Sequence, residues 1–325
     1  MSFFGGGTDY PVWFKEHGGA VLCSTINKYC YISCRYLPPF FKHKSRIAYS
    51  TVETVESNDA IQHPAVRETL KYLEIEEGVE IHHDGDLPAR TGLGSSSSFS
   101  VGLLHTLYAL KQVMPTRMQL ATGAIHVEQN LLKESVGCQD QVAAAFGGFS
   151  KIEFLPNSDI RVNPVIMSRE RVEEFQNHLV LYFTGFSRIA SDIAREQIEI
   201  TGKKDQELTR MRGMVDEGLG ILCGRGDLTA FGKLLDESWQ VKRSLTSKIS
   251  TPRIDEIYEV ARDAGAIGGK LLGAGGGGFI LLFVKPEAQS KVDEKLKGLL
   301  RVPFSFENRG SQIIVYQLES ELTQN

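Results

Sequence analysis

The sequence lacks several patterns that mark particular classes of protein. No Cys-x-x-Cys pair occurs among its five cysteines, and their odd number is typical of reduced thiols in a cytoplasmic protein. The longest apolar run, Phe279 to Val284, is far too short to span a bilayer. The formal net charge is only −4, from 36 basic and 40 acidic residues, so no broad attraction to nucleic acid or an anionic membrane is expected. Neither a zinc site nor a nucleic-acid or membrane partner is indicated.

Two common nucleotide-binding motifs are also absent. The Gly269-Lys270 pair is followed by Leu271, where a Walker-type phosphate loop requires Ser or Thr. A glycine run beginning at Gly273 fits the spacing Gly-x-Gly-x-x-Gly, but it leads into strand-like residues where a dinucleotide-binding fold requires a helix. We therefore reject both the Walker and the Rossmann interpretation.

The most informative segment that is present joins a glycine turn to four serines, within residues 92–98. An apolar pattern from Phe99 to Leu110 follows and lies on one face of a helix, so the serines fall in its first turn. Free backbone N–H groups and the helix dipole favour an anion there. A serine N-cap after an ordinary glycine turn is the plainer alternative. We predict a phosphate site formed by Gly92, Gly94, Ser95, Ser96 and Ser97.

The N-terminal segment 5–10 places three glycines before a threonine, an aspartate and a tyrosine. Glycines let the backbone approach a ligand closely, and a hydroxyl beside a carboxylate suits the binding of sugar hydroxyls. A simple hairpin turn is the alternative interpretation. The functional interpretation predicts substrate contacts at Gly6, Gly7, Thr8 and Asp9.

Two carboxylates stand downstream of the serine segment. Glu128 falls within an expected helix, and Asp140 ends a turn between two glutamines. Isolated acidic residues are usually solvated charges or caps. Beside a phosphate site, however, two carboxylates suit phosphoryl transfer, one binding Mg²⁺ and the other orienting or deprotonating the attacking hydroxyl.

The glycine-rich segment 268–278 is a further candidate. Its density of glycine is hard to explain by packing alone, and its place between two apolar segments argues against disorder. A flexible loop between two elements is the alternative. We expect the segment to close over the transferring phosphate, with Gly275 and Gly276 contacting the substrate.

A basic cluster at the end of an expected helix completes the candidates. Lys242 and Arg243 stand close to Lys248, and serine and threonine hydroxyls lie between them, a combination that suits a phosphate dianion. Favourable charge at a helix C-terminus explains the same residues equally well. Arg188 is the reserve candidate for this phosphate.

Hydrophobic periodicity predicts a mixed α/β chain of two domains, 1–165 and 166–325, that share a cleft. Strands are expected within 20–35, 79–83, 149–164, 178–183, 279–284 and 313–317. Besides the serine helix, helices are expected over 64–73, 116–133, 204–222, 227–243, 252–264 and 286–300.

In order and spacing, these segments resemble the GHMP sugar and small-metabolite kinases, over essentially the whole chain. Residues 88–96 are similar to the family's nucleotide phosphate loop, 270–278 to its third motif and 5–10 to its substrate loop. The resemblance implies a kinase that uses ATP and Mg²⁺, with Mg²⁺ bound by Ser96 and Glu128 and with Asp140 as the catalytic carboxylate. It also implies an α+β fold with a ribosomal-protein-S5-like N-terminal half and a ferredoxin-like C-terminal half.

Within that family, four segments resemble the D-glycero-D-manno-heptose 7-phosphate kinases: 3–11, 17–22, 25–29 and 248–252. The implied reaction phosphorylates the anomeric hydroxyl of the heptose 7-phosphate, giving the 1,7-bisphosphate for nucleotide-heptose synthesis. Galactokinases carry a Glu-His pair at the positions of Gly6 and Gly7, so their sugar contacts do not transfer. Family members also have a strand and a basic residue before the position of Ser2, whereas this sequence begins at Met1, a difference that a missing N-terminal segment or a misplaced start would explain.

Three alternatives stay open from the sequence. The first is another sugar 1-kinase, similar to fucokinases or galactokinases. The second is a sensor of sugar and nucleotide that binds without turnover on the same fold. The presence of Asp140, Glu128 and Ser96 together argues against a sensor, because binding without turnover does not need all three. The third concerns assembly, because a homodimer is as compatible with the sequence as a monomer.

Overall fold

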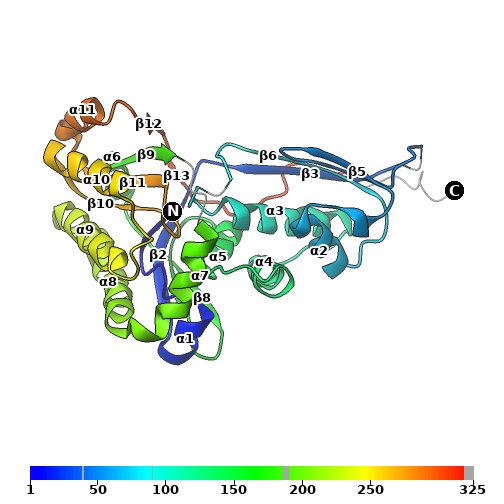
Figure 1. Ribbon diagram of the computed structural model, residues 1–325, viewed down its shortest axis with the longest axis horizontal. Coiled ribbons are helices and arrows are strands. Elements are labelled where there is room, and N and C mark those ends of the chain that lie inside the picture. Colours follow the sequence, from blue (N-terminus) through cyan, green and yellow to red (C-terminus); the bar gives the residue numbers. More distant parts are fainter. Residues whose placement is uncertain (39, 90, 186–189, 318–325) are drawn as a thin grey trace.

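Three β-sheets form the framework of the molecule, and helices pack against them (Figure 1). The structure is a computed structural model that describes residues 1–38, 40–89, 91–185 and 190–317. The first sheet has the order β1-β2-β7-β8, which are Ser2–Phe4, Gly19–Ile26, Phe149–Phe154 and Ile160–Pro164, and β13 (Phe306–Glu307) also pairs with β2. The second has the order β3-β6-β4-β5, which are Cys30–Tyr36, Val79–Gly85, Ser45–Ala48 and Val52–Val55. The third has the order β10-β11-β9-β12, which are Ala266–Leu271, Gly278–Val284, Leu179–Gly185 and Leu300–Arg301.

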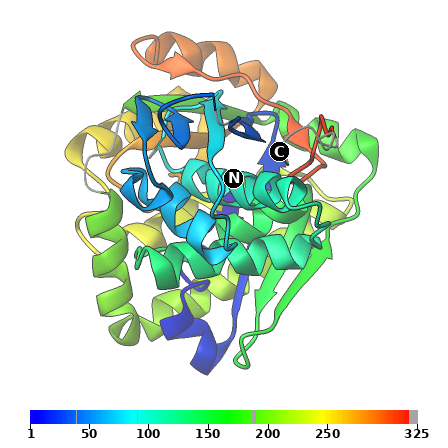
Figure 2. The same cartoon turned by 90° about the vertical axis from the view of Figure 1, so that its right-hand side faces the viewer.

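The helices fall into two groups along the chain. The first group is α1 (Pro11–His17), α2 (Pro64–Tyr72), α3 (Ser95–Leu110), α4 (Arg117–Ile125), a π-helix (His126–Leu131) and α5 (Gln139–Phe146). The second is α6 (Arg169–Asn177), α7 (Ala190–Ile200), α8 (Asp205–Cys223), α9 (Thr229–Arg243), α10 (Pro252–Ala264) and α11 (Pro286–Lys295). Figure 2 shows α2 and α3 beneath the strands of the second sheet, whereas α9 and α10 pack on β10 of the third.

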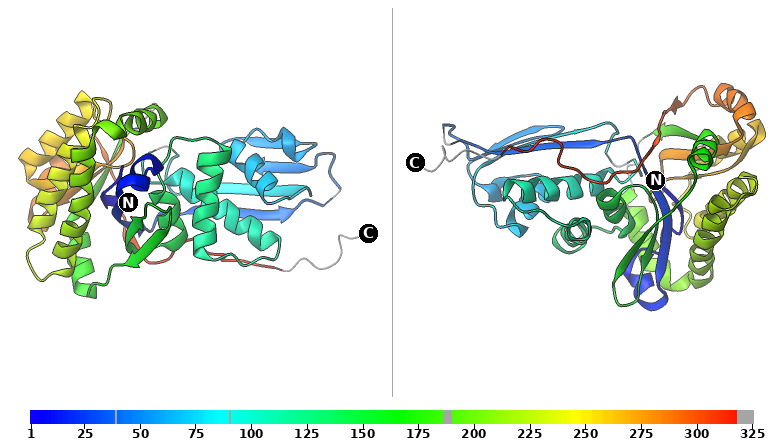
Figure 3. Two further views of the ribbon diagram at one scale, coloured as in Figure 1. Left: turned by 90° about the horizontal axis from the view of Figure 1, so that it is seen from below. Right: turned by 180° about the vertical axis from the view of Figure 1, so that it is seen from behind.

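The two halves of the chain meet at the first sheet. Helix α8 packs against β1 and β2, and the last part of the chain returns from the third sheet to pair β13 with β2. The Ser311 N–H then donates to the Ala144 carbonyl at 2.9 Å, so the C-terminal segment lies along the first half (Figure 3). The domain boundary near residue 165 stays a prediction.

Local signals explain why several predicted helices are confirmed closely. Helix α10 spans the predicted 252–264 because the Thr251 hydroxyl accepts from the Ile254 N–H at 3.3 Å and Pro252 occupies the first turn. Gly265, with φ of 118°, ends the helix in the left-handed region. The predicted helix 116–133 is in fact α4 followed by the π-helix, and such wide turns often occur at functional sites.

Two element predictions are wrong. Residues 312–317 form no strand, since most of their side chains are exposed and they join no ladder. The helix expected to reach residue 300 ends at Lys295, because the chain then forms β12 and pairs with β9. The glycine-rich segment 268–278 begins within strand β10, so the alternative of a flexible loop does not apply to residues 268–271. Its Gly268 is explained by packing, because a Cβ there would lie 1.9 Å from the Gly232 carbonyl of α9.

Candidate active site

The predicted phosphate loop leads into the open N-terminus of α3. Gly92 and Gly94 have φ of 84° and 71°, values that favour glycine, and Gly94 occupies the N-cap position without a side-chain cap. Ser96 is exposed and Ser95 half-buried in the first turn that follows. Backbone N–H groups at such a helix start, together with the helix dipole, suit a phosphate group.

The glycine-rich loop 272–278 packs directly on this phosphate loop. A Cβ on Gly92 would lie 2.5 Å from the Leu272 carbonyl oxygen, and one on Gly273 would lie 2.4 Å from the Gly92 Cα. A Cβ on Gly278 would lie 2.2 Å from the Thr91 carbonyl oxygen. Side chains cannot fit between two backbones this close, so the glycines on both loops are required by their mutual contact.

The glycine-rich loop is also held in place from the C-terminal half. The Gly276 N–H donates to the Ile249 carbonyl at 3.0 Å, and Gln197 Nε2 of α7 donates to the Ala274 carbonyl at 2.9 Å. Lys242 Nζ of α9 donates to the Gly273 carbonyl. These contacts tie the loop to three different segments rather than leaving it as a free connection.

The N-terminal segment is a turn closed by its own polar side chains. The Thr8 hydroxyl is fully buried, lies 2.8 Å and 2.9 Å from the carbonyl oxygens of Gly5 and Ala20, and accepts from the Ala20 N–H. The hydroxyl that we expected to bind sugar is therefore used inside the protein. Gly6 and Gly7 remain at the partly exposed edge of the turn.

Asp9 connects this turn to α5. Its Oδ1 accepts from the Gly7 N–H at 2.9 Å, and its Oδ2 accepts from the Gln139 N–H at 3.1 Å. The Asp9 residue is only 2% exposed, and this burial raises the pKa of its carboxyl group. The two N–H groups lower the pKa, but the effect of burial is larger. Gly137 packs against it so closely that a Cβ would lie 1.9 Å from Oδ2.

Asp140 lies where the N-terminal turn and the phosphate loop meet. It occupies the first turn of α5, and a Cβ on Gly94 would lie 3.2 Å from its carboxyl carbon. Burial raises the pKa of Asp140, and the Asp9 charge raises it further, whereas the positive charges of the Met1 amino group and Lys242 lower it. The structure thus brings Asp9, Asp140 and the phosphate loop together, as the sequence analysis expected of the last two.

Glu128 is buried on the π-helix beneath the serine turn. Its Oε2 accepts from the Ser97 hydroxyl at 3.1 Å and from Gln141 Nε2, whereas its buried Oε1 has no hydrogen-bond partner among the described residues. Burial raises the pKa of this carboxyl to about 7. The sequence analysis paired Glu128 with Ser96, but the hydroxyl in contact with it here is that of Ser97.

The three residues of the basic cluster do not converge. Lys242 is buried against the glycine-rich loop, while Arg243 pairs with Asp255 at 3.1 Å. Lys248 pairs with Glu196 at 2.6 Å. The reserve candidate, Arg188, lies outside the described residues. Lys242 therefore faces the same site as Asp140, and its two basic neighbours pair with acidic residues elsewhere.

A small cavity beside the N-terminal turn is lined in part by residues that the sequence analysis missed, namely Gln197, Thr201 and Lys204. Gly7 and Tyr10 line the cavity together with these residues. Lys204 Nζ donates to Glu207 at 2.8 Å and to the Ser244 carbonyl at 3.0 Å. No motif marks these residues, because they lie on or between amphipathic helices and only the packing of α7 brings them to the turn.

Metal clusters and membrane helices are not features of the part of the chain that the structure describes. No group of three or more His, Cys, Asp or Glu side chains is gathered there as a metal site. No helix in the same residues has the length and apolar character needed to cross a bilayer.

Comparison with known proteins identifies the family. Residues 59–148 match the model of the GHMP kinases N-terminal domain and residues 221–300 that of the GHMP kinases C-terminal domain, together more than half of the chain. A D-glycero-α-D-manno-heptose 7-phosphate kinase of Campylobacter jejuni is 29% identical over 314 residues, 91% of each chain. A galactokinase of Pyrococcus furiosus is 27% identical over 66% of this chain and 67% of its own.

Solved structures agree with these matches. The crystal structure of a D-glycero-D-manno-heptose 1-phosphate kinase from Bacteroides thetaiotaomicron superposes with a TM-score of 0.79 and 26% identity, covering 98% of this chain and 97% of its own. A mevalonate kinase from Methanococcus jannaschii, at 19% identity and a TM-score of 0.72, covers 95% of this chain and 96% of its own and shares the fold. The predicted α/β fold class is thereby confirmed. The chain belongs to the GHMP kinase family and is a phosphotransferase whose acceptor is a hydroxyl group.

Proposed function

We propose that this kinase transfers the γ-phosphoryl group of ATP to the anomeric hydroxyl of D-glycero-D-manno-heptose 7-phosphate. The product would be the 1,7-bisphosphate, used in nucleotide-heptose synthesis, and ADP would be released. The observation that carries the proposal is the position of Asp140, against Gly94 of the phosphate loop and beside the Asp9 turn. The similarity to heptose phosphate kinases over nearly the whole chain supports this substrate class.

In the proposed mechanism, positioning does most of the work. The N-terminus of α3 and residues Gly92 to Ser97 hold the nucleotide phosphates, and the Asp140 carboxylate accepts the proton of the attacking hydroxyl. That hydroxyl oxygen forms the new bond to phosphorus as the bond to the ADP oxygen breaks. Asp9 holds the N-terminal turn on the substrate side, where Gly6 and Gly7 expose backbone to the acceptor.

The residues around Glu128 fit a bound Mg²⁺. In the part of the chain that the structure describes, its buried Oε1 has no hydrogen-bond partner, and carboxylate and hydroxyl oxygens are the ligands that Mg²⁺ accepts. Glu128 and Ser96 would hold the ion, and the Ser97 and Gln141 side chains would orient the carboxylate. When bound, Mg²⁺ supplies positive charge that neutralises the nucleotide phosphates.

The acceptor would enter beside the small cavity at the N-terminal turn. Lys204 lines this cavity together with Gly7 and Tyr10, but its Nζ is bound to Glu207 and to the Ser244 carbonyl, so a contact with the 7-phosphate would require that pairing to open. Arg243 and Lys248, which the sequence favoured for this phosphate, are already paired with Asp255 and Glu196. We also propose that the enzyme works in the cytoplasm, where ATP is available and its five free cysteines stay reduced.

The experiment that tests this function is ATP consumption with a panel of acceptors. The panel contains the heptose 7-phosphate, the unphosphorylated heptose, the heptose 1-phosphate, fucose and galactose. We expect the highest kcat/KM with the 7-phosphate, and product analysis should place the new phosphate on the anomeric carbon. A higher kcat/KM with fucose or galactose would assign the enzyme to another sugar 1-kinase group, and binding of ATP without turnover would indicate a sensor.

A further inference from the structure

Lys242 is a buried lysine that points toward the candidate active site from the C-terminal half. Its side chain leaves the last turn of α9 and is only 7% exposed. The Nζ atom donates a hydrogen bond to the Gly273 carbonyl in the glycine-rich loop. Burying an ammonium group is costly unless charges or hydrogen bonds compensate it, so this position requires an explanation.

The surroundings of Lys242 are those of the candidate active site. Gly273, which accepts its hydrogen bond, packs against Gly92 of the phosphate loop, and Gly94 of the same loop packs against Asp140. The charges that face Lys242 are Asp9 in the N-terminal turn, Asp140 on α5 and the buried Lys270 on β10. Lys270 is held apart by a hydrogen bond of 2.8 Å from its Nζ to the Phe3 carbonyl.

We propose that Lys242 is a catalytic residue: its ammonium group contacts the transferring phosphoryl group, while the Gly273 carbonyl fixes its position between the two glycine loops. This inference rests on the proposed function. Asp9 and Asp140 would repel the phosphates that the loop is to bind, and Lys242, together with the Met1 amino group, offsets this negative charge. An ammonium group has three N–H bonds, so a donor remains for a phosphoryl oxygen after the bond to Gly273 is made. A cation held in place by such a hydrogen bond stabilises negative charge that develops in the transition state.

This role differs from the one that the sequence predicted for Lys242. A residue that binds the distal phosphate of the substrate would affect the KM of phosphorylated acceptors, whereas a residue at the transferring group affects kcat with every acceptor. The two roles are therefore separable by kinetics.

The pH profile gives a second, independent measure. Burial lowers the pKa of Lys242 to about 8, although the charges of Asp9 and Asp140 raise it. The ammonium form is present below that pH and is lost as the pH rises through it, so kcat/KM for ATP should fall on an alkaline limb near pH 8. Arginine at this position keeps its charge and should remove the limb.

The test compares Lys242→Met, Lys242→Arg and Lys233→Met with the unaltered chain. Lys233 is an exposed lysine on the same helix and serves as the matched control. We expect Lys242→Met to lower kcat about 10²-fold with phosphorylated and unphosphorylated acceptors alike, the range for losing one such donor, and to leave binding of a non-hydrolysable ATP analogue within a few fold. Lys242→Arg should retain measurable activity without the alkaline limb, and Lys233→Met should match the unaltered enzyme.

Different outcomes contradict the inference and the proposed function. If Lys242→Met keeps kcat within about threefold, or raises only the KM of phosphorylated acceptors, Lys242 does not contact the transferring group. If Lys242→Met does not fold, Lys242→Arg decides, because an unchanged limb near pH 8 would assign that titration to another group and overturn the inference. If the unaltered chain phosphorylates only another sugar, the proposed substrate is wrong while the Lys242 test still stands.

Discussion

The carboxylate of Asp9 accepts a hydrogen bond from the backbone N–H of Gln139 at 3.1 Å, and Gln139 directly precedes Asp140. The contact joins residues 130 positions apart in the sequence and fixes the N-terminal turn to the start of α5. It leaves so little room beside the carboxylate that position 137 must be glycine. The substrate turn and the proposed catalytic carboxylate are therefore positioned by one interaction.

Gly137→Ala should disrupt this connection. The new methyl group would occupy the place of Asp9 Oδ2, so the turn before Asp140 has to shift, and overpacking of this kind costs about 1–3 kcal/mol. We expect kcat to fall together with the free energy of unfolding, measured by steady-state kinetics and denaturant titration. Gly213→Ala, at an exposed position of α8 where the nearest atom is 4.0 Å away, is the control: it should leave kcat near its original value and raise the free energy of unfolding by about 0.5–1 kcal/mol, since alanine favours a helix more than glycine does. A fully active Gly137→Ala enzyme would show that the Asp9 contact is unimportant for catalysis.

Asp140→Asn should lower kcat by about 10²-fold or more, because the amide cannot accept the hydroxyl proton. ATP binding should change little, since the loop and the helix start that hold the phosphates stay in place. Steady-state kinetics and equilibrium binding of an ATP analogue separate the two effects. Near-normal kcat in this variant would remove Asp140 from the proposed mechanism.

Glu128→Gln and Ser96→Ala should each raise the Mg²⁺ concentration needed for half-maximal turnover, because each removes an oxygen ligand suited to Mg²⁺. Ser97→Ala is the informative comparison, since its hydroxyl contacts Glu128 in the structure. If Ser97 only orients the carboxylate, its loss should have a smaller effect than that of Ser96. Unaltered Mg²⁺ titrations in both Glu128→Gln and Ser96→Ala would rule out the proposed ligands.

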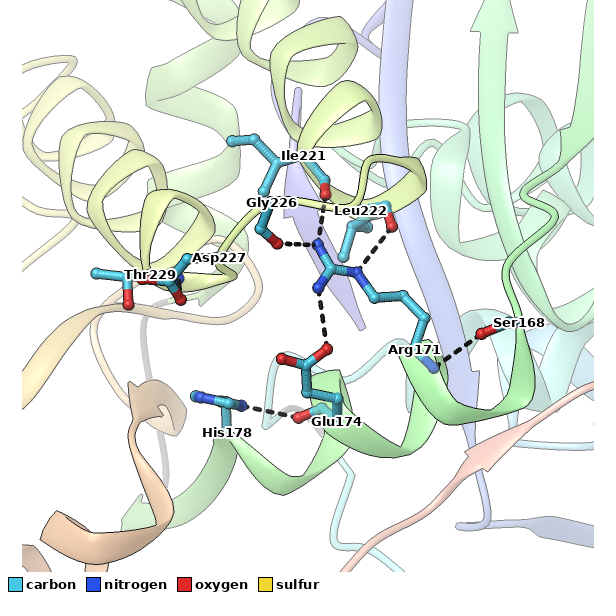
Figure 4. A network of polar contacts seen from close by, with 9 residues as sticks. All are labelled: Ser168, Arg171, Glu174, His178, Ile221, Leu222, Gly226, Asp227 and Thr229. Carbon is cyan, nitrogen blue, oxygen red and sulfur yellow. Dashed lines mark hydrogen bonds and ion pairs between the residues drawn. The ribbon is translucent and has the colours of Figure 1, made fainter.

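Arg171 fastens α6 to the end of α8 (Figure 4). Its guanidinium donates to the carbonyl groups of Leu222, Ile221 and Gly226 at 3.2, 2.8 and 2.9 Å, and to Glu174 at 2.9 Å. Carbonyls at a helix C-terminus lack intrahelical partners and carry the negative end of the helix dipole, so a cation is favourable there.

Arg171→Met should lower the free energy of unfolding by about 2 kcal/mol, because charged hydrogen bonds are lost, including two part-buried ones to the carbonyl groups of Ile221 and Leu222. Thermal or denaturant unfolding measures the change. Arg169→Met is the matched control on the same helix: its ion pair with Glu173 is exposed, and such pairs contribute about 0.5 kcal/mol or less. Equal effects of the two substitutions would mean that the contact with α8 adds no stability.

The local parts of this fold could be predicted from the sequence. The helix start at Ser95 and both ends of α10 follow from glycine, proline and threonine at specific positions, and the structure confirms them. The all-buried strand β11 follows from its apolar run. These features depend on neighbouring residues alone, so their signals are complete within a short segment.

Contacts between distant segments could not be predicted in the same way. The glycines of the segment 268–278 suggested a loop over phosphate, but Gly268 is required by α9 and Gly273 by the phosphate loop. Thr8 suggested a sugar contact, yet its hydroxyl closes the turn on Ala20. In each case the residue type was informative, and its partner lay in another element.

The sequence by itself determined the chemistry of the protein: a glycine-serine helix start for phosphate, two carboxylates, and an arrangement of motifs that identified the kinase family. Only the tertiary structure decided which side chains meet. It separated Arg243 and Lys248 from Lys242 and turned Lys242 toward Asp9 and Asp140, although the three basic residues are close in the sequence. The physical reason is that residue type and local spacing determine the chemistry available to a side chain. Which partners that side chain meets depends on burial and on charge pairing between segments that are distant in the sequence.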